Sequence, residues 1–433
     1  MSGTGHEHGA HHNHHGEEEE NRHLIVLKVG TSTLMKPCHT VNMANMGGLV
    51  DLVASIRRLP GYQVIIVTSA AVGFGCLKLN LENRPTSDQL SLKQAVAAAG
   101  QSHLIRLYED LFNAYNLKVA QILLSRSDFS AKDRFRNFRN ATNELLKMGV
   151  IPIINENDCI CVDELRFGDN DTLSALVAVS CNADKLFLLT DVDCLFDKNP
   201  HEFPDATPIR ELSSIELAKL DVDVAGDSEW GTGGMATKLV AARTAVAAGI
   251  ECILTHGAKP DKVLRYLRDG SENELMTVFR VAPDDMQFAV SKMTWRRRWM
   301  LALQTRGTVK LDSGAADAIR KKKSLFAAGI TEVEGGFHRD DCVSLVDAET
   351  GEEIARALVN LRDFEVKKIM GHRSSEYREV LGCIVAPEVA YRENIILTTG
   401  ALAVLDSEPE DSDQPSTPEE SSPALRLSYT ARS

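Results

Sequence analysis

Short, β-rich apolar runs alternate with amphipathic stretches over the first two-thirds of this 433-residue chain. Runs of this kind, bounded by turn residues, are typical of buried parallel strands. They are LIVLKV (24–29), VIIVT (64–68), KVAQILL (118–124), VIPII (150–154), KLFLLT (185–190) and ECILT (251–255). The amphipathic stretches include Leu90–Tyr115, Arg134–Met148, Thr172–Asn182 and Ala236–Ala248. Because such alternation implies right-handed βαβ crossovers, we predict an α/β fold, a three-layer αβα sandwich around a mostly parallel sheet.

The alternation stops near Met293, and short glycine-punctuated pieces such as GTVKLD and GITEVEGGF follow. This change predicts a boundary at about 285–295 and a second, small and mostly β domain. We therefore divide the chain into a first domain at 23–290 and a second at 296–405. Residues 1–22 are a His/Glu-rich low-complexity tail, and 406–433 an acidic Ser/Pro-rich one. Both tails are too polar to order themselves.

Composition argues against a disulfide-rich or membrane-spanning protein. The net charge is −13, but residues 1–23 contribute −4 and residues 406–433 contribute −5, so the domains themselves are nearly balanced. None of the nine cysteines forms a C-x-x-C pair, and no N-terminal apolar segment is present. We therefore expect reduced thiols, with Cys159 and Cys161 in the core, and a cytoplasmic location. No apolar run approaches the roughly 18 residues of a membrane helix.

Acidic and amide side chains are concentrated in the stretch INENDCICVDELRFGDNDTLSAL, from Ile154 to Leu176. Apolar segments flank it on both sides. Carboxylates next to core segments cost folding free energy unless they meet a metal, a cation or a ligand. This stretch predicts a functional site, although a solvated acidic loop is the alternative. It follows the fourth predicted strand, and ligands of such folds bind at the carboxyl ends of strands.

Two lysines lie where an anion would bind. Lys28, followed by Gly30, comes at the end of the first predicted strand, and Lys238 comes one turn into a helix that follows Gly231, Gly233 and Gly234. Backbone amides at a glycine-rich helix start bind phosphates. The spacing is neither that of a Walker A loop nor that of a dinucleotide-binding fingerprint, which disfavours P-loop NTPases and dinucleotide oxidoreductases. Lysines, glycines and clustered acids together indicate phosphoryl transfer.

At these residues the chain resembles the glutamate 5-kinases of the amino acid kinase superfamily. The matching motifs are LKVGTS, NEND, GDNDTLSAL, LLTDVDCLF and GTGGMATK, in the order and spacing of that family. The resemblance covers about 24–290, and the C-terminal region is similar to the PUA domain that many of these kinases carry. It implies ATP-dependent phosphorylation of the γ-carboxylate of L-glutamate to γ-glutamyl phosphate, the first step of proline biosynthesis.

Roles follow from the resemblance position by position. It implies that Lys28 and Lys238 are catalytic, together with Asp169 and Asp171, which would organise the lysines and Mg²⁺. Mg²⁺ is expected to arrive with ATP, with Asp171 as the candidate protein ligand. Glutamate would be bound by Ser69, Asp158 and Asn170, with Asp158 pairing with its ammonium group. ATP would be framed by Lys28, Thr190, Asp191, Thr232, Gly233, Gly234, Met235, Ala236, Thr237 and Lys238.

One position departs from the resembled pattern. The family usually has Ser-Gly-Ala where this chain has Ser69-Ala70-Ala71. Alanine resists the positive φ that glycine permits, at a cost of roughly 1 kcal/mol or more. We therefore expect that glutamate affinity or the path of this loop differs from the family norm.

Alternatives to a glutamate kinase remain at this point. A related enzyme could phosphorylate another carboxylate or a carbamate, and the chain could be an inactive regulator, which intact Lys28, Lys238 and Asp171 argue against. RNA binding by the PUA-like domain is a further alternative, but residues 296–405 carry 17 basic and 16 acidic side chains, too small an excess for sustained phosphate contact. No RNA or membrane partner is expected. The resemblance suggests a homo-oligomer, proline as feedback inhibitor and a separate γ-glutamyl phosphate reductase.

Overall fold

The computed structural model describes residues 22–36, 40–86, 89–125, 128–129, 132–160, 170–198, 200, 203, 205–219, 234–270, 274–281, 300, 303, 305–382 and 385–398. Residues 1–21 and 406–433 of the predicted tails and the predicted boundary at 285–295 lie outside these residues, so the division into domains stays a prediction there.

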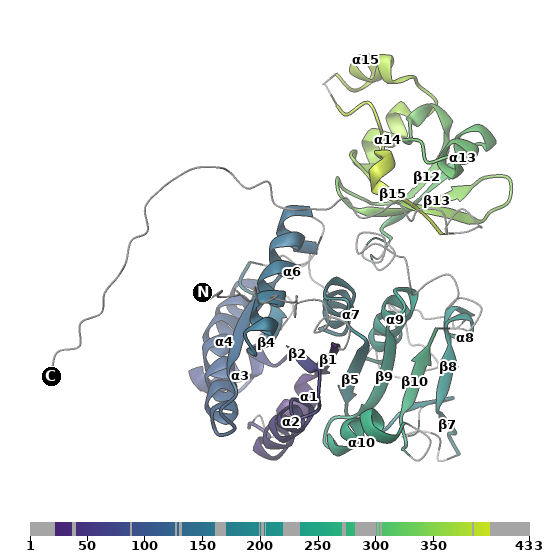
Figure 1. The fold of residues 1–433 in the computed structure, drawn as a ribbon. Helices are drawn as coiled ribbons and strands as arrows, with labels where there is room; N and C mark the ends of the chain where they lie inside the picture. The colour runs from purple at the N-terminus through teal and green to yellow at the C-terminus, as the bar shows by residue number, and fades with distance from the viewer. Residues whose placement is uncertain are drawn as a thin grey trace, which may run out of the picture.

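An eight-stranded sheet forms the centre of the larger part of the molecule (Figure 1). From one edge to the other its strands are β3 (Val119–Leu124), β4 (Ile151–Glu156), β2 (Tyr62–Thr68), β1 (His23–Val29), β5 (Lys185–Thr190), β9 (Glu251–His256), β10 (Thr277–Arg280) and β8 (Glu211–Ser213). The six predicted strands, β3 to β9 in this order, run parallel to one another. β10 is antiparallel to β9 and carries β8 on its other side.

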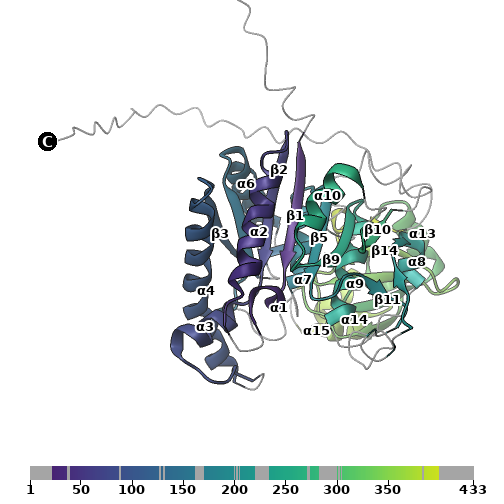
Figure 2. The same cartoon turned by 90° about the horizontal axis from the view of Figure 1, so that it is seen from below.

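Helices cover both faces of the sheet (Figure 2). One face carries α2 (Met43–Ile56), α4 (Leu90–Asn113) and α10 (Asp261–Asp269), and the other α6 (Lys132–Lys147), α7 (Asn170–Ser180) and α9 (Gly234–Ala247). Residues of β1 alternate between the two cores that result. Leu24 and Val26 belong to the core with α7 and α9. Ile25, Leu27 and Val29 belong to the core with α2 and α4. The predicted three-layer αβα sandwich is therefore confirmed.

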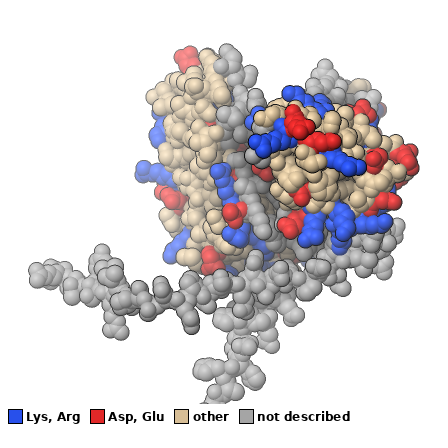
Figure 3. Space-filling model, turned by 90° about the horizontal axis from the view of Figure 1, so that it is seen from above, with Lys and Arg blue, Asp and Glu red and all other residues tan. Residues whose placement is uncertain are grey.

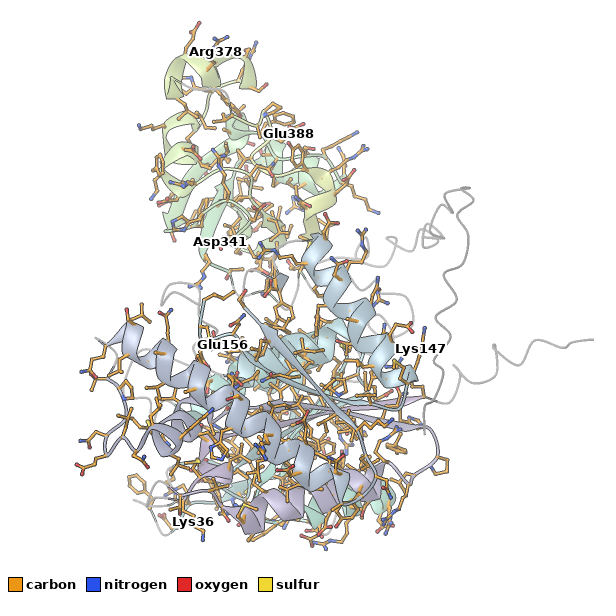
Figure 4. The ribbon with its side chains drawn as sticks, turned by 90° about the vertical axis from the view of Figure 1, so that its left-hand side faces the viewer. Lys36, Lys147, Glu156, Asp341, Arg378 and Glu388 are labelled. Carbon is orange, nitrogen blue, oxygen red and sulfur yellow. The ribbon has the colours of Figure 1, made fainter. Side chains whose placement is uncertain are left out.

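The carboxyl ends of the parallel strands lie at one edge of the sandwich. In Figure 4, Lys147 at the end of α6 and Glu156 at the end of β4 lie on opposite sides of this part of the molecule. β4 begins at Ile151, shortly after Lys147, and runs toward Glu156. Because the neighbouring strands are parallel to β4, their ends lie at the edge that Glu156 marks.

Two helices of this edge meet in backbone contact. α3 (Ala71–Leu79) begins three residues after β2 and packs against α4. A Cβ atom on Gly100 of α4 would lie 1.8 Å from the carbonyl oxygen of Ala71, and one on Gly75 of α3 would lie 1.9 Å from the carbonyl oxygen of Val96. Only glycine permits this approach at both positions. The contact therefore fixes where α4 lies along α3.

The second part of the described chain contains a five-stranded sheet. Its strands, in spatial order, are β12 (Ile330–Gly335), β11 (Gly307–Leu311), β13 (Cys342–Asp347), β14 (Glu353–Leu358) and β15 (Ile395–Leu397), with helices α13 (Ser313–Arg320), α14 (Asp363–Ile369) and α15 (Tyr377–Leu381). A separate hydrophobic core fills this domain, with Phe337 and Leu345 fully buried. The predicted small β domain is confirmed, and it carries short helices as well.

The small domain packs on the helix layer formed by α6, α7 and α9 (Figure 1). Cys342, Leu358 and Ile396 of its sheet belong to the same hydrophobic cluster as residues of these three helices. Its acidic and basic side chains are interspersed on the face that Figure 3 shows. None of the described helices is long and apolar enough to span a membrane.

Several features were not anticipated from the sequence pattern. β8 and β10 have only three and four residues, too few for a recognisable period. The helix α3, which follows β2 almost directly, is not among the predicted amphipathic stretches. Cys159, expected in the core, is exposed because it lies in the turn after β4.

We expect Gly100→Ala to lower the free energy of unfolding by about 3 kcal/mol, since its Cβ would overlap the backbone of α3 and no rotamer change can relieve the overlap. Denaturant unfolding followed by circular dichroism measures this change.

Gly47→Ala in α2 is the matched control, because a Cβ atom there would meet nothing within 4 Å. Alanine has the higher helix propensity, so this variant should be more stable by about 0.5–1 kcal/mol. Wild-type stability of Gly100→Ala would contradict the close contact between α3 and α4.

Candidate active site

A buried carboxylate joins two lysines at the carboxyl edge of the sheet. Asp171 Oδ1 pairs with Lys28 Nζ, and Asp171 Oδ2 lies 3.3 Å from Lys238 Nζ. Thr237 Oγ1 also donates to Oδ2, at 3.1 Å. The Asp171 side chain is 0 % exposed, against 6 % for Lys28 and 14 % for Lys238. One negative charge thus holds two positive charges together in a site with little access to water.

Strand geometry explains why these three residues meet. Side chains alternate along β1, so Lys28 projects to the same face as Leu24 and Val26, toward α7 and α9. Asp171 lies in the first turn of α7, where the helix dipole favours a negative charge. Lys238 lies one turn into α9. The structure therefore brings both lysines to Asp171, as predicted.

A glycine lies beside each lysine. An ideal Cβ atom on Gly30 would lie 3.5 Å from Lys28 Nζ, and one on Gly234 would lie 3.7 Å from Lys238 Nζ. Lys238 Nζ also donates to the carbonyl oxygen of Gly234 at 2.8 Å. Because glycine occupies these two positions, no side chain there covers the ammonium groups. This arrangement suits an anion with several oxygens, such as a phosphate chain.

A second polar cluster is centred on Asn170, the residue before Asp171. Asn170 Nδ2 lies 2.8 Å from the carbonyl oxygen of Thr68, 2.8 Å from Ser69 Oγ and 3.0 Å from Asn155 Oδ1. Asn155 Nδ2 and Asn170 Oδ1 are buried and make no hydrogen bond within the described residues. A buried donor and a buried acceptor without partners indicate a place for a polar ligand. The predicted residues Ser69 and Asn170 are thus brought together.

Asp158 lies two residues beyond Glu156, in the half-buried turn that follows β4. It therefore lies at the same edge of the sheet as Asn155, which is part of β4. Three other predicted site residues, Asp169, Thr232 and Gly233, lie outside the described residues.

The described residues of the predicted nucleotide site lie at the end of β5 and at the start of α9. Thr190 is buried and its Oγ1 donates to Asp191 Oδ1 at 2.9 Å, while Asp191 itself is exposed. The carbonyl oxygen of Thr190 accepts from the amide of Gly257 at 2.7 Å. At the start of α9, Gly234 is exposed, Met235 half-buried and Ala236 buried.

A charged cluster next to this segment was not predicted. Lys262 Nζ lies 2.6 Å from Asp193 Oδ1, and Lys259 Nζ lies 2.9 Å from the same oxygen. Burial acts to raise the pKa of Asp193, but hydrogen bonds from Lys262 and Lys259 outweigh it and hold that pKa below its ordinary value. Asp193 belongs to the TDVD motif, whereas the lysines lie 66 and 69 residues further along and no sequence pattern links them to it.

Metal binding by the protein alone has little support in the described residues. No group of three or more His, Cys, Asp or Glu side chains in them could hold a metal ion. Both oxygens of Asp171 already face ammonium groups or a hydroxyl donor, which a bound cation would have to displace. A direct bond between Asp171 and Mg²⁺ therefore does not fit the arrangement.

Comparison with known proteins identifies both parts of the chain. The sequence profile of the Amino acid kinase family matches residues 23–256, and that of the PUA domain matches residues 307–381. Among solved structures, UMP kinase from Ureaplasma parvum covers 60% of this chain and 99% of its own, at 14% identity and a TM-score of 0.42.

Curated relatives match over nearly their whole length. Glutamate 5-kinase from Rippkaea orientalis is 45% identical over 382 residues, which cover 86% of this chain and 99% of that protein. Glutamate 5-kinase from Acaryochloris marina is 46% identical over 380 residues, with the same coverage. With the αβα sandwich and the paired lysines, these matches show that the chain belongs to the glutamate 5-kinase family.

Proposed function

We propose that this protein transfers the γ-phosphoryl group of ATP to the γ-carboxylate of L-glutamate, giving γ-glutamyl phosphate for proline biosynthesis. Membership in the glutamate 5-kinase family supports the reaction. The assignment of roles rests on one observation: the Asn170 cluster and the lysine cluster meet at the start of α7. Asn170 belongs to the polar cluster with Ser69, and Asp171 pairs with the two lysines.

Glutamate would bind at the Asn170 cluster. Asn155 Nδ2 and Asn170 Oδ1 offer a buried donor and a buried acceptor, and Ser69 Oγ lies beside them. Asp158, at the same edge, supplies the negative charge that would pair with the ammonium group of the substrate. We propose Ser69, Asp158 and Asn170 as the residues that bind glutamate and align its γ-carboxylate.

The lysines would act on the transferred group. An oxygen of the γ-carboxylate attacks the γ-phosphorus, the bond from that phosphorus to the bridging oxygen breaks, and ADP leaves with the electron pair. Lys28 and Lys238 would stabilise the negative charge on the phosphoryl oxygens, and buried Asp171 would keep both ammonium groups in position. We propose that Asp169 assists Asp171 in this role. Mg²⁺ bound with ATP would neutralise charge on its phosphates, and we do not propose Asp171 as a ligand of this ion.

The nucleotide would lie across the ends of β5 and the start of α9. Thr190 and Asp191 are proposed to frame one side, and the segment 232–238 the other. Amide groups at the start of a helix attract phosphates, which agrees with the position of Gly234 at the start of α9.

Further assignments rest on the family resemblance. A homo-oligomer, feedback inhibition by proline and a separate reductase that consumes the labile acyl phosphate are proposed on that basis, as is a cytoplasmic location. For the PUA domain we favour a regulatory role over RNA binding. Arg320 pairs with Asp347, and Arg339 with Glu365, so part of its positive charge is already neutralised.

The decisive experiment is an assay of the purified protein with ATP, Mg²⁺ and a panel of carboxylates. Hydroxylamine traps any acyl phosphate as a hydroxamate, which shows that the acceptor is a carboxyl group. We expect ADP release and hydroxamate with L-glutamate, and much less with aspartate or N-acetylglutamate. Preference for another carboxylate or for carbamate would favour the related-enzyme alternative.

We expect Lys28→Ala and Lys238→Ala each to reduce kcat by roughly 10²–10³, with a smaller change in KM for glutamate, because their charges act mainly as negative charge develops on the phosphoryl group. Steady-state kinetics at saturating Mg-ATP measure both constants. Near-normal turnover in either variant would remove that lysine from the mechanism.

Asp158→Asn and Asp171→Asn should fail in different ways. The first removes the counter-charge of the substrate ammonium, a contact worth about 1.5–3 kcal/mol, so KM for glutamate should rise strongly. The second frees two lysines from their shared partner, so kcat should fall while KM for glutamate changes less. Each variant serves as the control for the other, since both exchange one carboxylate for an amide. Normal KM in Asp158→Asn, or normal kcat in Asp171→Asn, would contradict the assigned role.

A further inference from the structure

Ala70 has a backbone conformation that its side chain disfavours. It lies between Ser69 and α3 with φ 80° and ψ 8°, in the left-handed region. The other described non-glycine residues with positive φ are polar: Asn80, Asn116, Asn182, Lys322 and Asp340. A β-carbon makes this region unfavourable, and alanine lacks the local hydrogen bonds that help asparagine and aspartate adopt it. Such strain persists only where the surrounding structure holds it, and it often occurs at functional sites.

A tyrosine from α4 holds the residues just before Ala70. The hydroxyl of Tyr108 and Thr68 Oγ1 share a buried hydrogen bond of 2.9 Å. The Thr68 hydroxyl also donates to the carbonyl oxygen of Ser69 at 3.3 Å, which leaves Tyr108 as the donor in the shared bond. Burial raises the pKa of Tyr108 well above its ordinary value, so the phenol keeps its proton and remains a donor.

The same short segment bears the proposed glutamate contacts. The carbonyl oxygen of Thr68 and Ser69 Oγ both lie 2.8 Å from Asn170 Nδ2. A shift of the Thr68 peptide would therefore change the position of Ser69 relative to Asn170. Tyr108 itself is 0% exposed and forms part of the core, so it reaches the ligand only through Thr68.

Tyr108 is itself held in a fixed position. Gly100, two turns earlier in α4, touches the carbonyl of Ala71 so closely that a Cβ atom would lie 1.8 Å from it. Phe112, one turn later, is fully buried and stacks on Tyr108. The helix that carries the hydroxyl is thus fixed against the turn that receives it.

We propose that Tyr108 is a positioning residue for the acceptor substrate, whose hydroxyl holds Thr68 and thereby keeps Ala70 in its left-handed conformation and Ser69 against Asn170. The proposal rests on the proposed function in assigning Ser69 and Asn170 to glutamate. The β-carbon of Ala70 disfavours the left-handed conformation of this turn, and the hydrogen bond from Tyr108 stabilises it, so the two groups have opposite effects on the same turn.

The first test is Tyr108→Phe, which removes one oxygen atom and keeps the ring. We expect KM for glutamate to rise about three- to tenfold, the range of a single hydrogen bond. KM for ATP and kcat should stay within about twofold, because the hydroxyl of Tyr108 bonds to Thr68 and the two lysines are held directly by Asp171.

Tyr266→Phe is the matched control. Tyr266 is also largely buried, and its hydroxyl donates to Glu251 Oε1 at 2.6 Å. Glu251 begins β9, so this bond lies at the edge of the sheet opposite the site. Both tyrosine variants should lower Tm by a few degrees, but only Tyr108→Phe should change KM for glutamate. A change of KM in both, or in neither, would overturn the proposal.

The second test uses Ala70→Gly, because glycine adopts positive φ without strain. Without the strain, the turn should need Tyr108 less. Tyr108→Phe should then raise KM for glutamate less than twofold in the Ala70→Gly background, and it should lower Tm less there than in the wild type. Equal effects of Tyr108→Phe in both backgrounds would overturn the coupling between Tyr108 and Ala70.

These outcomes separate the inference from the proposed function. Wild-type protein that does not phosphorylate glutamate would contradict the function, and the Tm measurements, which need no substrate, would still decide whether Tyr108 holds the Ala70 turn. Active wild-type protein with an unchanged KM in Tyr108→Phe would contradict only the inference.

Discussion

The site depends on the ion pairs that the buried carboxylate of Asp171 forms with Lys28 and Lys238. Two lysines next to each other would repel, and each would lose hydration on burial, so neither position is favourable without the shared counter-charge. Removing one member of such a group costs more than the contact itself, because the remaining charges stay buried without compensation. β1, α7 and α9 must therefore keep their relative positions for the charges to stay balanced. The hydrophobic core beneath them, which includes Leu24 and Val26, secures those positions.

The start of α7 connects the lysine cluster to the cluster that we propose binds the acceptor substrate. Asn170 and Asp171 are consecutive, so their side chains leave the helix in different directions, the first toward Ser69 and Asn155 and the second toward the lysines. A rotation of this helix start would disturb both clusters together. In the proposed mechanism this geometry would couple binding of the acceptor to placement of the positive charges, as an in-line transfer between two bound substrates requires.

The sequence predicted the parts of this protein that follow a local rule. Apolar runs marked the six parallel strands, and the motifs around Lys28, Asp171 and Lys238 marked residues that the structure brings into contact. Contacts between distant residues without a periodic signal were missed. Tyr108 and Thr68 are 40 residues apart, and Lys262 and Asp193 are 69 apart; each pair forms only because helices pack on the sheet in one register. Ala70 was recognised as a departure, but only the structure shows that it adopts positive φ in spite of its side chain.

The buried lysine cluster and the left-handed turn at Ala70 are both energetically unfavourable. They lie at the ends of adjacent strands near the middle of the sheet. Val29 of β1 pairs with Thr68 of β2, so the lysine cluster and the strained turn are neighbours. β1 and β2 have strands on both sides and helices on both faces, and their backbones have little freedom to relax. Unfavourable conformations and buried charges can persist there because the stability of the surrounding core offsets them. If the reaction occurs here as proposed, the substrate would meet dipoles and charges already in place, so that little reorganisation of the protein is needed.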